Sequence, residues 1–172
     1  MSFVQQLRAA TAGDHDTVDA AFGGFALDDA AGYRRFLLAH ARALPAVEAA
    51  LATAADDALP AWRPRTPALA GDLRAMDAAM PEPFAFDASD DAARWGALYV
   101  IEGSRLGGQL LARTVPAGLP AAYLAARHLP GEWRRLLAAL DARAAACGAA
   151  WCEAALAGAR ATFALYARAA EV

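Results

Sequence analysis

The sequence has no lysine, only two cysteines and no apolar run approaching the ~20 residues of a membrane span. All 16 basic residues are arginines, and against 19 acidic residues they leave a net charge of −3. Without an overall basic field, we expect neither nucleic acid nor a membrane surface as a partner. Cys147 and Cys152 lack the spacing of CxxC or zinc-ligand motifs, which favours reduced thiols. The opening MSFVQQLRAA carries no signal-peptide pattern, so we expect a cytoplasmic protein.

Alternation typical of strands is essentially missing, whereas apolar residues recur at helical spacing along the chain. A length of 172 residues fits one domain, 1–172, with a sizeable core. The pattern therefore predicts an all-α, single-domain helical bundle. Helix-breaking and helix-capping residues predict the helix boundaries. The first four helices are expected at about 2–22, from 28 or 29 to about 53, at 67–80, and from 89 or 90 to 114. A short helix is expected to end at 128–130, and it is followed by 131–146 and 148–170, which are either two helices or one helix bent at Gly148. The proline-containing stretch 54–67 is expected to be a loop.

The three histidines differ in what surrounds them in the sequence. His128 precedes Leu-Pro at a helix end, which favours a carbonyl cap or a solvent-facing side chain. His40 lies on the apolar stripe of its helix and is expected to be a hydrogen-bonded core residue. His15 lies on such a stripe too, but Asp19 follows four residues later on the same face, and Arg8 precedes it by two turns. That carboxylate can hold Nδ1–H and leave Nε2 free for a metal, although a buried pair that only orders the core would look the same.

The stretch YVIEGSRLGGQLLAR (99–113) places glycines inside a predicted helix, where each costs roughly 1 kcal/mol relative to alanine. Gly103 and Gly107 are four residues apart and share one face, and Gly96 and Val100 extend that face into a low strip. Such a strip usually lets two helices approach closely, or permits a kink. The alternative is a flat ligand lying against the backbone, and Gly108 additionally favours a bend. The spacing alone leaves both interpretations open.

Taken together, these segments resemble the bacterial, biliverdin-producing heme oxygenases. LRAATAGDHDTVDAAF (7–22) is similar to the family's proximal helix, and GALYVIEGSRLGGQLL (96–111) resembles its distal helix. HARALPAVEAAL (40–51) and ATFALY (161–166) are also similar to bacterial members. The resemblance implies a bundle that holds heme, as cofactor and substrate, between the first helix and the glycine-containing helix. It further implies oxidative cleavage of heme to biliverdin, CO and iron with O2 and an external reductant.

Site residues follow from the resemblance one by one. His15 would be the proximal iron ligand, and the catalytic distal positions would be Gly103, Ser104 and Gly107. The remaining contacts to heme would come from the proximal helix, the distal helix and the last helix, namely Arg8, Thr11, Asp19, Val100, Gly108, Arg160, Phe163 and Tyr166. Arg8 would meet a propionate, and Arg160 would help to wall the pocket and pair with a propionate.

Three residues depart from the family pattern. Asp19 stands where glutamate is common, so its link to His15 is expected to run through water or to be lost. Ser104 replaces the catalytic aspartate of animal enzymes, and Arg105 introduces a charge directed to solvent or to the heme edge. The departures keep open a heme-binding protein without oxygenase activity, used for storage, sensing or delivery. A thiaminase-type member acting on another ligand is the other alternative, although neither cysteine is placed as a nucleophile.

The resemblance also implies partners besides heme and O2. An electron donor such as ferredoxin or a flavin reductase would supply the reductant. A bacteriophytochrome is a further expected partner, as the acceptor of biliverdin.

Overall fold

The computed structural model describes residues 1–55 and 58–171, and each predicted helix has a helical counterpart in it, with differences at the ends. No strand occurs in these ranges, as expected for an all-α bundle. The helices are α1 (Phe3–Ala10), α2 (Ala12–Phe22), α3 (Ala30–Ala52), α4 (Thr66–Ala75), α5 (Asp91–Leu111), α6 (Ala122–Ala125), α7 (Glu132–Cys147) and α8 (Ala149–Ala170). The expected loop 54–67 ends at residue 65, two residues early, because α4 begins at Thr66. Its residues 56 and 57 lie outside the described part, as does residue 172.

The first predicted helix, 2–22, is in fact two helices that meet at Thr11. Ser2 caps α1 through a capping box with Gln5, so the predicted start is confirmed. At Thr11 the backbone leaves helical geometry (φ −106°, ψ 5°), and its hydroxyl donates to the carbonyl of Leu7 at 2.9 Å. A threonine that bonds back onto the preceding turn competes with the regular helix ladder, and this break turns α2 away from α1.

Other helix ends follow local chemistry. The side chains of Asp29 and Asp90 accept backbone N–H bonds and cap α3 and α5. Gly148, at φ +82°, separates α7 from α8, so the C-terminal region is two helices rather than one bent helix. The expected helix 67–80 ends early, at Ala75, and the chain turns through Asp77 in the left-handed region (φ 53°).

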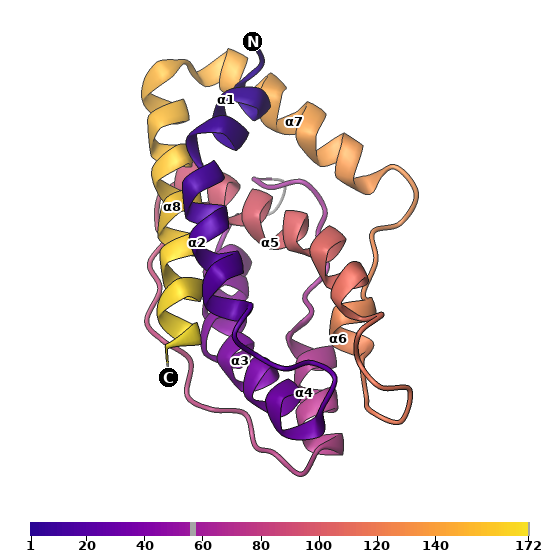
Figure 1. Ribbon diagram of the computed structural model, residues 1–172. Coiled ribbons are helices and arrows are strands. Elements are labelled where there is room, and N and C mark those ends of the chain that lie inside the picture. The colour runs from indigo at the N-terminus through magenta and orange to yellow at the C-terminus, as the bar shows by residue number, and fades with distance from the viewer. Residues whose placement is uncertain (56–57, 172) are drawn as a thin grey trace.

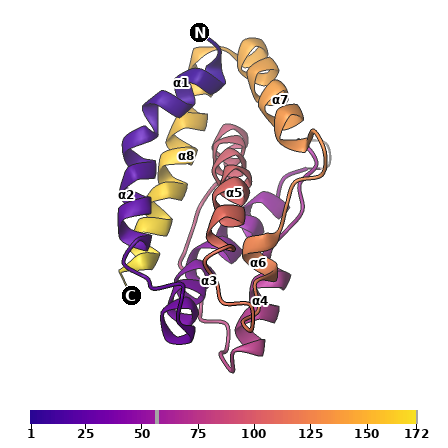
Figure 2. The same ribbon diagram turned by 45° about the vertical axis from the view of Figure 1, so that its right-hand side comes forward.

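The core is centred on α3, whose apolar residues at helical spacing are buried. Tyr33, Leu37, Leu44, Val47 and Leu51 are all essentially inaccessible to solvent. α8 packs against α3, α5 and α2, and Figures 1 and 2 show α2 and α8 running side by side across the front of the bundle. α5 crosses behind α2, while α7 leaves toward the N-terminal end of the molecule. Within the described ranges, no helix is both long and apolar enough to span a membrane.

The contact between α5 and α8 is the most extensive helix pair, and glycines make it possible. A Cβ on Gly96 would lie 1.9 Å from the carbonyl oxygen of Ala155, and one on Gly158 would lie 2.3 Å from that of Ala93. The two backbones therefore touch at these points. The helix-packing interpretation of the glycine strip is correct for Gly96.

We expect Gly96→Ala to lower the free energy of unfolding by about 3 kcal/mol, because the added methyl must push α5 and α8 apart. Urea unfolding followed by circular dichroism measures the loss. The matched control is Gly71→Ala within α4, where a Cβ meets nothing within 4 Å and helix propensity should raise stability by up to ~1 kcal/mol. Equal stability of both variants would contradict the close α5–α8 contact.

Candidate functional site

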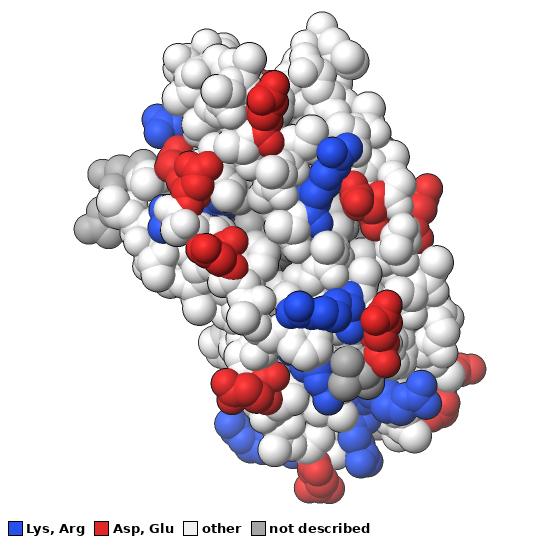
Figure 3. Space-filling view, turned by 90° about the vertical axis from the view of Figure 1, so that its left-hand side faces the viewer, with Lys and Arg blue, Asp and Glu red and all other residues white. Residues whose placement is uncertain are grey.

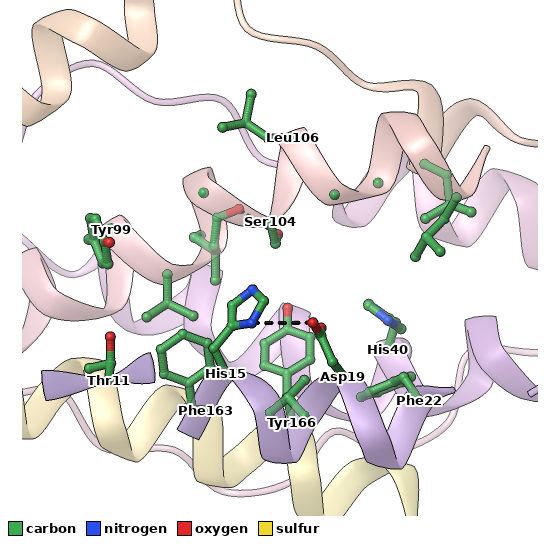
Figure 4. A pocket seen from close by; sticks show the side chains of 18 of the residues that line it. Thr11, His15, Asp19, Phe22, His40, Tyr99, Ser104, Leu106, Phe163 and Tyr166 are labelled. Atoms are coloured by element: carbon green, nitrogen blue, oxygen red, sulfur yellow. Dashed lines mark hydrogen bonds and ion pairs between the residues drawn. The ribbon is translucent and has the colours of Figure 1, made fainter. Parts of the chain in front are cut away.

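A cavity of about 500 Å³ lies between α2 and α5, and α8 closes one side of it. Figure 4 shows His15 and Asp19 projecting from α2 toward Ser104 on α5, with Phe163 and Tyr166 of α8 beside them. The volume falls in the range of small-molecule and cofactor sites, and most of the lining is apolar, as is usual for such sites.

The structure brings together all but one of the expected site residues. Those that line the cavity are Arg8, Thr11, His15, Asp19, Val100, Gly103, Ser104, Gly107, Gly108, Phe163 and Tyr166. Arg160 does not line it, which corrects the expectation that this arginine walls the pocket. Its guanidinium instead donates to the carbonyl of Ala10 at 3.0 Å and lies 3.5 Å from the carboxylate of Asp14. Arg160 thus fastens α8 to the junction of α1 and α2.

His15 is presented to the cavity by its position on α2. Its Nδ1 lies 3.3 Å from a carboxylate oxygen of Asp19, and its ring meets that of Phe163 edge to face at 6.0 Å. The shorter aspartate therefore reaches the imidazole directly, and the expectation of a lost or water-bridged link is wrong. The side chain of His15 is 60% exposed, so it is not a satisfied core histidine. With Nδ1 facing a carboxylate, Nε2 is the nitrogen available to a ligand.

Across the cavity, the glycines of α5 divide into two groups. Gly107 faces open space, since a Cβ there would meet nothing within 4 Å, and Gly103 would bring a Cβ to 3.3 Å from the Trp133 ring. A Cβ on Gly108 would lie 3.1 Å from the carbonyl oxygen of Leu124 at the edge of α6. The glycine strip therefore combines helix packing with cavity lining. Gly96 packs on α8, and Gly103 and Gly107 leave helix backbone without side chains along the cavity.

Ser104 is held on this wall by a residue that the sequence did not single out. Its hydroxyl donates to the carbonyl of Ile101 at 2.7 Å and accepts from the guanidinium of Arg65 at 2.8 Å. Arg65 is 4% exposed, lines the cavity and also donates to the Ile101 carbonyl at 2.5 Å. Its guanidinium lies 5.3 Å from the centre of the Tyr123 ring. A buried cation is thus fixed behind the glycine wall.

Glu48 of α3 positions the backbone from which Arg65 projects. Its carboxylate accepts from the backbone N–H of Arg65 at 2.6 Å and of Thr66 at 3.0 Å, and from the Thr66 hydroxyl at 2.6 Å. These bonds satisfy donors at the start of α4 that have no partner within the helix. The fold therefore places one carboxylate where it sets both a helix start and the approach of Arg65.

His40, expected to be a hydrogen-bonded core histidine, has that bond and also reaches the cavity. Its Nδ1 lies 2.6 Å from the Tyr123 hydroxyl, and its ring packs against Phe22 and Phe36. Burial, reinforced by the positive charge of Arg65, lowers the pKa of His40 to about 3. The imidazole is therefore neutral at physiological pH.

The depressed pKa makes stability depend on acid. Below about pH 6.5 His40 becomes protonated in the unfolded chain, whereas in the folded chain it becomes protonated only when the pH falls to about 3. Stability present above pH 6.5 is therefore lost toward pH 3, by about 1.4 kcal/mol per pH unit. We expect His40→Gln to show an unfolding free energy with a slope shallower by that amount between about pH 6 and pH 4. Urea titrations at several pH values measure it, and parallel slopes for the two proteins would contradict it.

Tyr99 is a second lining residue that the sequence did not single out. Burial raises the pKa of Tyr99, and the nearby charge of Arg8 opposes that shift. Figure 4 shows Tyr99 and Thr11 at one end of the cavity, and Phe22 and His40 toward the other. Its position three residues before Glu102 and four before Gly103 puts it one turn from the glycines, a spacing from which it could have been inferred.

Arg105 and His128 differ from expectation for one shared reason. Arg105 is 2% exposed and its Nε donates to both carboxylate oxygens of Glu102, so it faces neither solvent nor the cavity. His128 stacks on Trp133 at 5.6 Å, with Nε2 3.2 Å from the same carboxylate. Expectations of a carbonyl cap or a solvent-facing ring at His128 are therefore wrong. The Glu102 carboxylate pairs with both residues, and through His128 it links α5 to the segment before α7.

Both cysteines lie away from the cavity. Cys147 is exposed at the end of α7 and Cys152 lies in the first turns of α8, and neither lines the cavity. Among the described residues there is also no cluster of three or more histidine, cysteine, aspartate or glutamate side chains that could bind a metal ion alone. A metal at this site would therefore depend on a single imidazole and on a ligand that brings its other donors.

Known proteins resemble this chain in sequence and in fold. No protein-family profile matches it. A heme oxygenase of Xanthomonas campestris pv. campestris (strain 8004) is 43% identical over 113 residues, which are 60% of this chain. The match spans 65% of that relative's length, slightly under two thirds.

The fold comparison extends over almost the whole chain. The crystal structures of the NO- and CO-bound heme oxygenase from Neisseria meningitidis superpose with a TM-score of 0.81 and 26% identity, covering 99% of this chain and 91% of that one. The chain is therefore similar to heme oxygenases in sequence over 60% of its length and in fold over almost all of it.

Proposed function

We propose that the protein is a heme oxygenase, which cleaves heme to biliverdin, CO and iron with O2 and an external reductant. The observation that carries the proposal is the cavity in which His15 on α2 opposes the side-chain-free wall of Gly103 and Gly107 on α5. Names of the Xanthomonas and Neisseria proteins support it.

The residues present fit heme by shape and by donor chemistry. An open strip of backbone at Gly107 admits a flat macrocycle that a Cβ-bearing wall would obstruct. His15 would offer Nε2 of its imidazole to the iron, with the Asp19 carboxylate 3.3 Å from Nδ1. Arg8 lines the cavity near Tyr99 and would meet a propionate. The bound heme would supply the iron that activates O2 and would itself be the carbon skeleton that is oxidised.

The remaining residues set the environment on the distal side. Gly103 and Gly107 place no acidic or basic side chain of their own on the α5 wall, so heme held there would meet helix backbone at these positions. The Ser104 hydroxyl, held by Arg65 and the Ile101 carbonyl, is a fixed polar group in this wall. His40 remains neutral and keeps its hydrogen bond to Tyr123. The apolar rings of Phe22, Phe163 and Tyr166 limit water in the rest of the cavity.

Hemin titration followed by reduction under O2 tests the function. We expect a strong Soret band at one equivalent of hemin and, on addition of ascorbate or reduced ferredoxin, its replacement by biliverdin absorbance. Hemin binding without ring opening would identify a heme-binding protein used for storage, sensing or delivery. Failure to bind hemin would refute the proposal and favour a protein of this fold that acts on another ligand. Thiaminase-type chemistry is disfavoured even then, because neither cysteine lines the cavity.

The proposed function requires an electron donor and an acceptor for biliverdin. A ferredoxin or a flavin reductase is the proposed electron donor, and a bacteriophytochrome is a proposed acceptor of biliverdin. Cytoplasmic location is the setting in which both would be met.

A further inference from the structure

Exposed leucines gather at the end of α5 and beside it. Among the described residues, four of the five large hydrophobic side chains that are exposed lie here: Leu106 (46%), Leu110 (62%) and Leu111 (39%) on α5, and Leu129 (59%) between α6 and α7. Exposed apolar side chains that cluster in this way mark an interaction site more often than scattered ones do. We call them the leucine patch.

A recess of about 460 Å³ opens at one side of the leucine patch, where Leu106 and Leu129 line it, and it adjoins the candidate heme cavity. Leu106 and Trp133 line both hollows, so one side of the recess is a wall of the cavity. Exposed Arg127 and Arg134 line the recess, and none of its lining residues is aspartate or glutamate. The patch is thus an apolar centre with a basic rim, next to the substrate.

Charge is distributed unevenly along the chain. Residues 103–131 include all four leucines of the patch and contain three arginines and no carboxylate, a formal net charge of +3. Arg105 is buried and paired with Glu102, whereas Arg113 and Arg127 are exposed. Because the whole chain carries −3, the other 143 residues carry −6. By contrast, the face shown in Figure 3 interleaves charges of both signs. Two carboxylates flank this segment: Glu102 is paired with Arg105, and Glu132 is paired with Arg63 and accepts the backbone N–H of Leu129.

We propose that the leucine patch is the docking surface for the electron donor, and that this donor is a small acidic one-electron carrier protein. The inference rests on the proposed function, which requires an external reductant. An acidic rim on the partner would meet Arg127 and Arg134, and apolar side chains would enter the recess beside Leu129. One electron leaves the reduced carrier, which is oxidised, and reduces ferric iron of the bound heme to ferrous iron.

A concave recess favours a protein over a lipid surface. Membrane-binding helices insert a protruding apolar face and carry many cations, whereas here Leu106 and Leu129 border a hollow and the chain is negative overall. A second copy of the chain would bring the same basic rim against this one, which opposes pairing through the patch. An acidic protein can enter the recess and is attracted by the basic rim, so it meets neither objection.

Kinetics with two reductants test the docking surface. The probe is an acidic plant-type [2Fe–2S] ferredoxin kept reduced by its NADPH reductase, and ascorbate serves as the small-molecule reductant. Arg127→Glu/Arg134→Glu and Leu129→Ser should each lower kcat/KM for ferredoxin, the double variant roughly tenfold or more, and leave ascorbate-driven turnover unchanged. The control, Arg34→Glu/Arg74→Glu, makes the same charge change at exposed positions of α3 and α4 outside the recess and should match the wild type.

Binding of oxidised ferredoxin to the heme-free chain is a readout independent of turnover. Calorimetry should show binding that weakens with salt and is lost in Arg127→Glu/Arg134→Glu but retained in the control. Unchanged ferredoxin kinetics and binding in the patch variants would overturn the inference. So would patch-dependent binding to phosphatidylserine vesicles, or a dimer that the patch variants dissociate. If no variant and no reductant gives ring opening, the proposed function fails, while the calorimetry still decides the docking.

Discussion

His15→Ala is expected to reduce biliverdin formation by more than roughly a hundredfold, because outer partners of metal ligands alone typically contribute 10–100-fold. Nε2 of this imidazole is the one nitrogen on the α2 wall that is both accessible and backed by a carboxylate. Without it, the iron loses its protein ligand, and the Soret band of the hemin complex should shift and broaden. Absorption spectra and single-turnover assays with ascorbate measure the two effects.

Folding should not be affected by that substitution. The side chain is 60% exposed and packs mainly against the edge of Phe163, so we expect a change in unfolding free energy within about 0.5 kcal/mol. Asp19→Ala is the graded companion: it removes the carboxylate 3.3 Å from Nδ1 and should weaken heme affinity or turnover by roughly tenfold while ligation persists. A wild-type spectrum in His15→Ala would show that another residue binds the iron, and would refute the assignment.

The two walls of the cavity could be predicted from sequence because each is local. Asp19 follows His15 by one helical turn, and Gly103 precedes Gly107 by one, so helix geometry alone puts each pair on one face. The break at Thr11 went unpredicted, but it leaves that register intact on α2. Local periodicity is therefore sufficient to find residues that act as a pair on one helix.

Contacts across the fold could not be predicted in the same way. Arg65 meets Ser104 from 39 residues away, and only the packing of α3, α4 and α5 decides that this arginine of a proline-containing loop is the one buried. His128 has a helix-end sequence, yet the carboxylate of Glu102 and the ring of Trp133 draw it inward. The prediction for Arg160 was wrong for the opposite reason. Its helix does lie beside the cavity, but pairing with Asp14 keeps its guanidinium outside.

Glycine spacing shows the same limit most clearly. Gly96, Gly103 and Gly107 share one face of α5, but a Cβ would strike the α8 backbone at the first and enter open space at the last. Identical local signals therefore have different consequences for a substitution. What a glycine does on a helix depends on what stands opposite, which one helix's sequence does not contain.

Gly107→Leu is expected to weaken hemin binding by roughly a hundredfold or more while the protein stays folded. An isobutyl group at this position would project into the cavity opposite His15, and fitting heme beside it would cost about 3 kcal/mol. Removal of a glycine from a helix interior should itself favour folding, by up to about 1 kcal/mol. Hemin titration and thermal unfolding of the heme-free protein measure the two effects separately.

The opposite signs of these effects distinguish a ligand wall from a packing seam. If α5 met another helix at Gly107, the leucine would destabilise the heme-free protein as Gly96→Ala is expected to do, and binding would fall only because folding fails. Gly71→Leu is the matched control, since it adds the same side chain to α4, at a helical glycine that also faces open space but does not line the cavity. It should leave hemin affinity unchanged. Tight hemin binding by a folded Gly107→Leu variant would place the heme elsewhere and remove the main support for the proposed function.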